Sequence, residues 1–305
     1  MSVVKQYMQH FGLAALKVAY ARGENITHLL RQGECNDLQA IELAYDLQAG
    51  SYTRGALADI AALQRRATSM AQLLQPHVQP LDVLLDCGSG ELTTLSALSQ
   101  HLSNGVKLLA FDISLSRLNA GRRFAQRFMC EQQWRHLELF AAGIGQIPLG
   151  ANSVDVVLTS HALEPNYGRE PELLAELLRV SRRKLVLFEP SYEDNTQEGQ
   201  ARMRELGYIR DLPAHIAAAG GRLLSKTALP DPINPLNPTY CYIVEKSPSQ
   251  QSEGLVETRF LCPQSGAELE RRDGYLWSSD GGYAYPMVNG IALLRESDAI
   301  LMCHD

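Results

Sequence analysis

The sequence lacks the features that mark membrane, secreted and strongly nucleic-acid-binding proteins. No uninterrupted apolar run approaches the ~20 residues that span a bilayer, so we expect no membrane attachment. The opening residues MSVVKQYMQHFG have neither an apolar signal core nor a small-residue cleavage site, which predicts a cytoplasmic location. The net charge of −6 gives no overall positive field to attract phosphates. A nucleic-acid partner therefore stays open but is not favoured.

Cysteine is sparse, and its spacing argues against two more classes of protein. The chain has 6 cysteines among 305 residues, and none of them stands in a CxxC pair. This spacing provides neither the paired thiolates of a structural zinc site nor the framework of a small disulfide-rich domain. We therefore expect reduced thiols and no metal. The length exceeds that of a usual single domain and predicts two domains.

The pattern of apolar residues changes along the chain from helical to alternating. From residue 3 to residue 74, apolar side chains recur every three or four residues, which predicts helices with a loop at 50–52. Further on, short apolar runs alternate with helical stretches, which is typical of βαβ units. The fold class is therefore α/β, with a Rossmann-like, doubly wound and mostly parallel sheet. Its buried strands are expected at 81–87, 106–111, 137–141, 154–159 and 184–188, with a late strand at 239–244.

Three parts follow from this pattern. Residues 1–75 are expected to form a helical segment that acts as a lid or as a dimer interface, so a homodimer stays open. Residues 76–247 form the α/β domain, and residues 254–305 form a small β-rich domain. The stretch SPSQQSEG between them is polar and small, as a linker should be.

A candidate ligand site lies at the turn after the first strand. The strand runs directly into Asp86-Cys87-Gly88-Ser89-Gly90 and then into a helix. Glycines let the backbone approach a ligand closely, and the helix start offers free N–H groups to a carboxylate or a ribose oxygen. A tight turn without a ligand is the alternative, because a GxG alone is a weak motif.

The end of the second strand strengthens the case for a nucleoside ligand. This strand ends in Asp112, and a carboxylate at that point can accept both hydroxyls of a ribose. Asp112 could instead cap the following helix, but Ser114 or Ser116 would serve equally well. We therefore favour the ribose role for Asp112.

With the segment IPLGANSVDVV at 147–157, these motifs make residues 81–190 resemble the class I S-adenosylmethionine-dependent methyltransferases. The resemblance implies S-adenosylmethionine as cofactor and S-adenosylhomocysteine as product. Two departures stand out, because Leu92 replaces a frequent third glycine and Gly143 replaces a frequent acidic residue after the third strand. The resemblance implies cofactor contacts from Asp86, Gly88, Ser89, Gly90, Asp112, Ile113, Gly143, Ile144 and Ser160.

Upstream, residues 45–54 resemble the segment that folds over the cofactor in several of these enzymes. Tyr52 and Arg54 are expected to close on the methionine end of the cofactor, with Arg54 pairing with its carboxylate. An ordinary connecting loop with an exposed arginine is the alternative.

Catalytic candidates follow the fourth and fifth strands. His161 has a pKa range suited to a general base, and Glu164 or Glu189 could orient it. The alternatives are that His161 only lines the cofactor pocket and that Glu189 satisfies local donors. The sequence leaves these alternatives open.

Residues 258–301 resemble the small activator subunit of transfer-RNA and release-factor methyltransferases, and Asn289-Gly290 predicts a hairpin there. Some relatives of that subunit bind zinc through four cysteines, but here only Cys262 fits a ligand position, so no zinc is expected. The sequence therefore favours a methyltransferase whose acceptor is a small metabolite, such as a sugar or acid derivative. The alternatives are methylation of transfer RNA or a translation factor, and a non-catalytic cofactor-binding scaffold.

Overall fold

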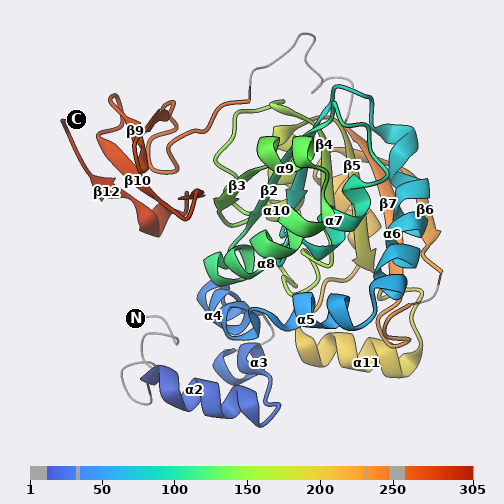
Figure 1. Ribbon diagram of the computed structural model, residues 1–305. Coiled ribbons are helices and arrows are strands. Elements are labelled where there is room, and N and C mark those ends of the chain that lie inside the picture. The colour runs from blue at the N-terminus through green and yellow to red at the C-terminus, as the bar shows by residue number, and fades with distance from the viewer. Residues whose placement is uncertain (1–11, 32–34, 231, 247–257, 305) are drawn as a thin grey trace.

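The computed structural model describes residues 12–31, 35–230, 232–246 and 258–304, and its centre is one extended β-sheet (Figure 1). The strand order is β6-β7-β5-β4-β1-β2-β3, continued by β11-β10-β9-β8, with β12 paired to β10. Strands β1 to β5 run parallel, whereas β7 is antiparallel to both β5 and β6. The strands of the α/β part are β1 (Val83–Cys87), β2 (Lys107–Asp112), β3 (Glu138–Ala141), β4 (Val154–Ser160), β5 (Ser181–Pro190), β6 (Gly221–Ala228) and β7 (Thr239–Lys246).

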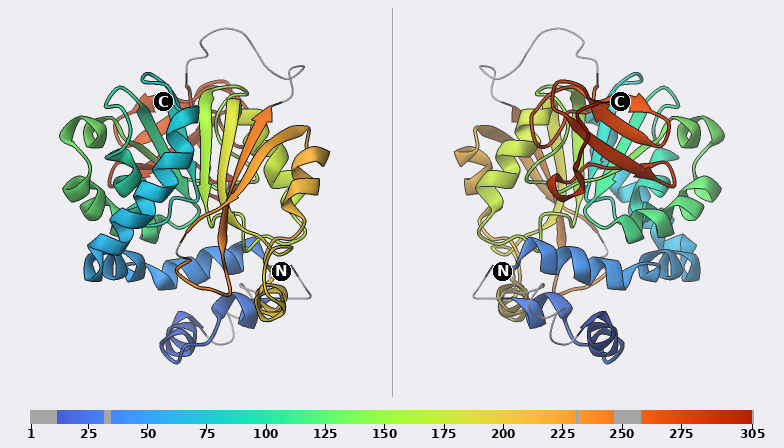
Figure 2. Two further views of the ribbon diagram at one scale, coloured as in Figure 1. Left: turned by 90° about the vertical axis from the view of Figure 1, so that its right-hand side faces the viewer. Right: turned by 90° about the vertical axis from the view of Figure 1, so that its left-hand side faces the viewer.

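Helices cover both faces of this sheet (Figure 2). One face buries an apolar cluster from α6, α7 and α8, and the other buries a cluster from α10 and α12. The α/β prediction is therefore confirmed, and Pro171 lies in the first turn of α10, where proline is well tolerated. The helices that the structure describes are α2 (Gly12–Ala21), α3 (Ile26–Leu30), α4 (Leu38–Gln48), α5 (Ser51–Ala58), α6 (Ile60–Leu74), α7 (Thr93–Ser99), α8 (Leu115–Phe128), α9 (Glu131–His136), α10 (Glu170–Val180), α11 (Gln197–Leu206) and α12 (Leu212–Ala218).

The sequence-based prediction was wrong at two places. The loop expected at 50–52 is reduced to a break at Gly50, because α5 already begins at Ser51. Gly50 takes φ +88°, which reverses the chain without a longer loop. Strand β6 was missed because most of its residues are exposed, so it carries no buried apolar run. The expected linker at 247–254 lies outside the described residues.

The C-terminal strands β8 (Glu270–Arg272), β9 (Tyr275–Ser278), β10 (Tyr283–Val288), β11 (Ile291–Leu293) and β12 (Ile300–Leu301) extend the sheet beyond β3. Asn289 and Gly290 both have positive φ and connect β10 to β11, so the predicted hairpin is confirmed. Strand β11 pairs in parallel with β3, and Leu294 N–H donates to the carbonyl of Ala141 at 2.8 Å. The C-terminal part therefore covers an edge that would otherwise expose unpaired backbone groups.

The C-terminal strands also share an apolar cluster with the α/β part. Buried Leu294 and Tyr285 belong to the same cluster as Phe140 and the apolar face of α10. We therefore expect Leu294→Ala to lower the free energy of unfolding of the whole protein by about 2–5 kcal/mol, because it leaves a cavity in a shared core. The control is Leu301→Ala, since Leu301 is 71% exposed.

The measurement uses the chain's 2 tryptophans, Trp134 in α9 and Trp277 in β9. Urea unfolding followed by fluorescence in Trp134→Phe and Trp277→Phe backgrounds reports the two parts separately. Coincident transitions that Leu294→Ala shifts together are expected. A shift seen only through Trp277 would show that the C-terminal part unfolds on its own and contradict the shared core.

Candidate cofactor and catalytic site

The turn after β1 is held by hydrogen bonds to the end of β2. Ser89 N–H donates to the carbonyl of Phe111 at 2.9 Å, and Gly90 N–H donates to the carboxylate of Asp112 at 2.8 Å. Gly88 has φ +69°, and a Cβ on it would lie 2.5 Å from the Cβ of Ala162. Only glycine fits at this point, because the loop after β4 packs directly on the turn.

The residue in place of the third glycine has an unusual backbone conformation. Leu92 precedes α7 with φ +57°, a left-handed conformation that glycine adopts more easily. Its side chain is completely buried in the cluster beneath α6, α7 and α8. The turn therefore keeps its shape without glycine, and burial of the leucine side chain offsets the backbone strain.

Asp112 is not the cap of the next helix. Ser114 takes that role, because its hydroxyl accepts the N–H of Arg117 at 3.1 Å. Asp112 is buried, accepts the N–H of Ser114 at 2.9 Å, and lines a pocket at the carboxyl ends of the strands. Asp112 can therefore bind a ribose, and its alternative role as the helix cap is excluded.

Two buried carboxyls give this site an acidic character. Burial, and secondarily the neighbouring Asp112, raise the pKa of Asp86 to about 8. Burial also raises the pKa of Asp112, while Arg117 and backbone N–H groups oppose that rise. A ligand that brings positive charge would relieve both carboxyls. S-adenosylmethionine carries a sulfonium and an ammonium group, so these residues fit it.

The pocket brings together residues from the turns that follow β1, β2, β3 and β4. Those that sequence analysis named and that line it are Gly88, Asp112, Ile113, Gly143, Ile144 and His161. Asp86, Ser89, Gly90 and Ser160 belong to the turns and strand ends around it but do not line it. Helix α4 covers the pocket with Leu38, Ile41 and Tyr45. The pocket is therefore built from the strand ends below and an N-terminal helix above.

The segment expected to fold over the cofactor is fixed by Glu91, which sequence analysis missed. The buried Glu91 carboxylate accepts the N–H groups of Gly50 at 2.9 Å, Tyr52 at 3.3 Å and Thr53 at 2.8 Å. It thereby satisfies free donors at the start of α5. A glutamate directly after the GxG was the available signal, but its partners are about 40 residues away in the chain.

The two residues predicted to close on the methionine end lie differently on α5. The ring of Tyr52 stacks against the guanidinium of Arg117, with 4.7 Å from Cζ to the ring centroid. Arg54 is exposed and does not line the pocket. Both cofactor contacts stay predictions.

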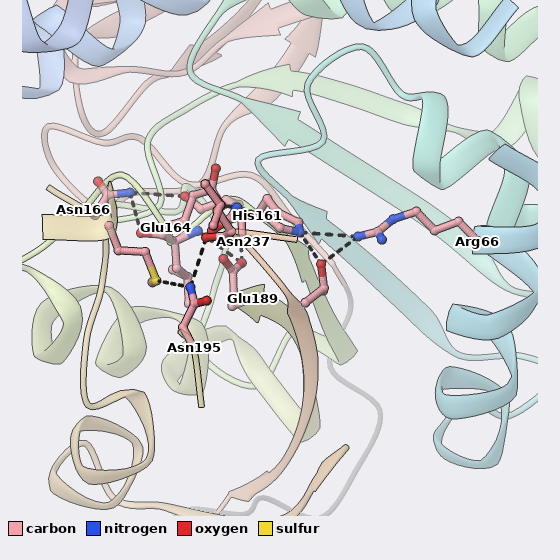
Figure 3. Close-up of polar contacts among 12 residues, drawn as sticks. Arg66, His161, Glu164, Asn166, Glu189, Asn195 and Asn237 are labelled. Atoms are coloured by element: carbon pink, nitrogen blue, oxygen red, sulfur yellow. Dashed lines mark hydrogen bonds and ion pairs between the residues drawn. The ribbon is translucent and has the colours of Figure 1, made fainter. Parts of the chain in front are cut away.

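A hydrogen-bonded network surrounds His161 at the end of β4 (Figure 3). His161 Nδ1 lies 2.6 Å from the Glu164 carboxylate, and Nε2 lies 2.7 Å from the hydroxyl of Thr239. Arg66 of α6 donates to Thr239 at 3.0 Å and lies 3.4 Å from His161 Nε2. Because arginine only donates, this arrangement favours the tautomer with the proton on Nδ1, directed at Glu164.

The two partners shift each other's pKa in opposite directions. Burial lowers the pKa of His161, but the charge and hydrogen bond of Glu164 outweigh it, so the pKa is raised above the usual value. Burial raises the pKa of Glu164, but His161 and a hydrogen bond from Asn237 outweigh it and lower the pKa. The Asn237 amide lies 3.1 Å from the same carboxylate oxygen. Glu164 is thus held ionised beside the imidazole.

Glu189 supports this arrangement from below. One of its carboxylate oxygens accepts the N–H groups of Ala162 at 3.0 Å and Leu163 at 3.2 Å. These bonds shape the turn in which His161 has the unusual φ of +56°. Glu189 is completely buried, and burial raises its pKa to about 7. A catalytic role for Glu189 stays a prediction.

Sequence analysis missed Arg66, Asn237 and Thr239. The late strand expected at 239–244 is confirmed as β7, which begins at Thr239, directly after Asn237 and Pro238. The antiparallel pairing of β7 with β5 brings these residues to the site, because Thr239 pairs with Pro190. No local pattern shows such a return, so only the sheet order could have revealed Asn237 and Thr239.

The described residues contain no cluster of three or more His, Cys, Asp or Glu side chains suited to a metal ion. Within the same residues, no helix combines the length and the apolar character that crossing a membrane requires.

Asp86 allows a test of the electrostatics of the site without any ligand. Its carboxyl keeps a proton in the folded state up to about pH 8, whereas the unfolded chain releases that proton near pH 4. The resulting stability is complete below pH 4 and is lost as the pH rises from 4 to 8, by at most about 1.4 kcal/mol per unit. Asp86→Asn removes this loss.

We therefore expect Asp86→Asn to be more stable than the wild type at pH 8 and to gain much less at pH 5. Urea unfolding at both pH values, without cofactor, measures the difference. Asp273→Asn, at an exposed carboxylate, is the control. An equal effect of Asp86→Asn at pH 5 and pH 8 would contradict the raised pKa.

Comparison with known proteins agrees with this site. Residues 85–187 match the family model described as a methyltransferase domain. That range begins in β1, spans the turns described above and ends within β5. No curated protein matches the chain significantly.

Solved structures of similar fold include three methyltransferases. A SAM-dependent methyltransferase from Aquifex aeolicus is 16% identical with a TM-score of 0.44, over 58% of this chain and 88% of that chain. Magnesium protoporphyrin IX methyltransferase from Synechocystis, with bound SAH, is 14% identical with a TM-score of 0.48, over 80% and 99%. Geranyl diphosphate C-methyltransferase from Streptomyces coelicolor is 14% identical with a TM-score of 0.48, over 61% and 82%. Residues 85–187 therefore match a methyltransferase domain, and the acidic pocket lies at the strand ends of this matched range.

Proposed function

We propose that the enzyme methylates an oxygen or nitrogen atom of a small polar metabolite. The observation that carries this proposal is a second cavity of about 240 Å³, open to solvent, which adjoins the cofactor pocket. The two hollows share Tyr45 of α4 and Pro165 of the loop after β4. A ligand in the second cavity would therefore lie beside the cofactor.

The lining of this cavity favours a hydroxylated molecule such as a sugar derivative. Aromatic rings and neutral hydrogen-bonding groups suit the faces and hydroxyls of such a ligand. Among the described residues that line it, Glu24 is the only charged one and none is Lys or Arg, so this described lining offers no cation to an acidic ligand or to RNA phosphates. The polar and aromatic lining residues are Tyr20, Asn25, Thr27, Asn36, Tyr45, Gln48 and Tyr208.

The cavity has firm walls on the side of the α/β domain. The amide of Asn36 donates to the carbonyl of Pro165 at 2.8 Å and to that of Leu206 at 3.1 Å. It thereby connects the segment before α4 to the loop after β4 and to the last residue of α11. A site held in this way can position an acceptor for an in-line displacement.

His161 is the group best placed to act as the general base. Bound S-adenosylmethionine supplies an electrophilic methyl on a positive sulfur, and its transfer leaves S-adenosylhomocysteine. His161 lines the cofactor pocket, and its Nδ1 lies 2.6 Å from the Glu164 carboxylate oxygen that accepts its proton. Nε2 is then the atom that takes the proton of the acceptor, either directly or through the hydroxyl of Thr239.

Cofactor binding is expected to depend on Asp112. Asp112→Asn should weaken binding of S-adenosylmethionine and S-adenosylhomocysteine at least tenfold, because bonds to a charged carboxylate contribute about 1.5–3 kcal/mol. Calorimetric titration measures the affinities, Asp273→Asn is the control, and thermal unfolding verifies that the variant is folded. Unchanged affinity in Asp112→Asn would contradict the ribose role.

Catalysis is expected to depend on the pair of His161 and Glu164. With an acceptor found by transfer of labelled methyl to sugars, nucleotide sugars and amines, His161→Asn should lower kcat by roughly 10²–10⁴-fold. Glu164→Gln should move the rising limb of the pH–rate profile to lower pH, because Glu164 raises the pKa of His161.

Affinity for S-adenosylhomocysteine should survive both substitutions. A full rate in His161→Asn would exclude His161 as the base. Labelling of transfer RNA or a translation factor, but of no small molecule, would favour the macromolecular alternative. Cofactor binding without labelling of any of these would favour a non-catalytic scaffold.

A further inference from the structure

Arg117 is a buried cation that the site described above leaves without a role. It lies on α8, is 8% exposed and lines the cofactor pocket. Its guanidinium lies over two aromatic rings, with Cζ 4.7 Å from the ring centroids of both Tyr45 and Tyr52. These contacts come from the covering helices α4 and α5, so the arginine joins the cover to the base of the pocket.

The charge of Arg117 is not paired directly. Among the described residues, no carboxylate oxygen lies within ion-pairing distance of its guanidinium, and its Nε is buried without a hydrogen-bond partner. Burial lowers the pKa of Arg117, but Asp112 and other nearby acidic groups outweigh burial and raise it. A buried guanidinium with a free donor and no direct partner favours the binding of an anion.

The glycine turn makes room for this side chain. A Cβ on Gly90 would lie 2.4 Å from Nη2 of Arg117 and 2.8 Å from its Cζ. The guanidinium therefore lies directly against the turn after β1, where the cofactor approaches the backbone. Any side chain at position 90 would displace it.

From these contacts we propose that Arg117 binds the carboxylate of the methionine part of the cofactor. This carboxylate is the only anionic group of S-adenosylmethionine, and the guanidinium lies in the cofactor pocket with a free donor. Contacts with the rings of Tyr45 and Tyr52 restrict the guanidinium, which favours recognition of a carboxylate at this point. Arg54, the candidate from sequence, is exposed and outside the pocket lining.

The test compares S-adenosylhomocysteine with its decarboxylated analogue by calorimetric titration. The wild type is expected to bind S-adenosylhomocysteine more tightly than the analogue. Arg117→Gln should weaken binding of S-adenosylhomocysteine roughly ten- to a hundredfold and leave binding of the analogue almost unchanged. Arg117→Lys keeps the positive charge but loses the planar guanidinium, so it should retain only part of the preference.

Arg123→Gln, at an exposed arginine of the same helix, is the matched control and should keep the full preference. If Arg117→Gln weakens both ligands equally, the preference for S-adenosylhomocysteine over the analogue is unchanged. If Arg117→Lys also leaves this preference unchanged, Arg117 has a structural role and the proposal is overturned. Loss of the preference in Arg54→Gln alone would also overturn it, in favour of Arg54. These outcomes depend only on ligand binding, so they are independent of whether the acceptor is a small metabolite.

Discussion

The hydrogen bond from Gly90 N–H to the Asp112 carboxylate is the contact on which the rest of the site depends. The parallel register of β1 and β2 makes it possible, because Cys87 pairs with Phe111 and both strands end together. The same turn then places Glu91, which holds the start of α5 over the pocket. One contact between two turns thus determines both the base of the pocket and the position of its cover.

The charges of the pocket are arranged for a ligand that carries both signs. Asp86 and Asp112 are buried acids whose pKa values are raised by burial, which is unfavourable in the free protein. Arg117 is a buried cation with a free donor on the same side of the turn. A ligand with an ammonium, a sulfonium and a carboxylate matches the signs of these charges, whereas a neutral nucleoside offers only the ribose contact. Charge complementarity therefore selects the cofactor as much as shape does.

Features that depend on consecutive residues could be predicted from the sequence, whereas features that depend on contacts between distant segments could not. The buried strands, the GxG turn, Asp112 and the Asn289-Gly290 hairpin each follow from a few consecutive residues. Thr239, by contrast, reaches the site through strand order, and Arg117 through the packing of α8 under two tyrosines. From the sequence alone, an arginine on a helix is expected to be solvent-exposed, because no neighbouring residue in the chain indicates which segment covers it.

Arg295 shows why the covering parts act together with the α/β domain. Its guanidinium donates to the carbonyl of Ile113, directly after Asp112, at 3.2 Å, and it forms an ion pair with Glu42 of α4. One C-terminal side chain thereby joins the end of β2 to the helix above the pocket. Because β11 also continues the sheet at β3, a displacement of the C-terminal strands would disturb both the floor and the roof of the cofactor site. None of the described C-terminal residues lines the pocket, so this part supports the site from outside, through its contacts with β3, Ile113 and Glu42.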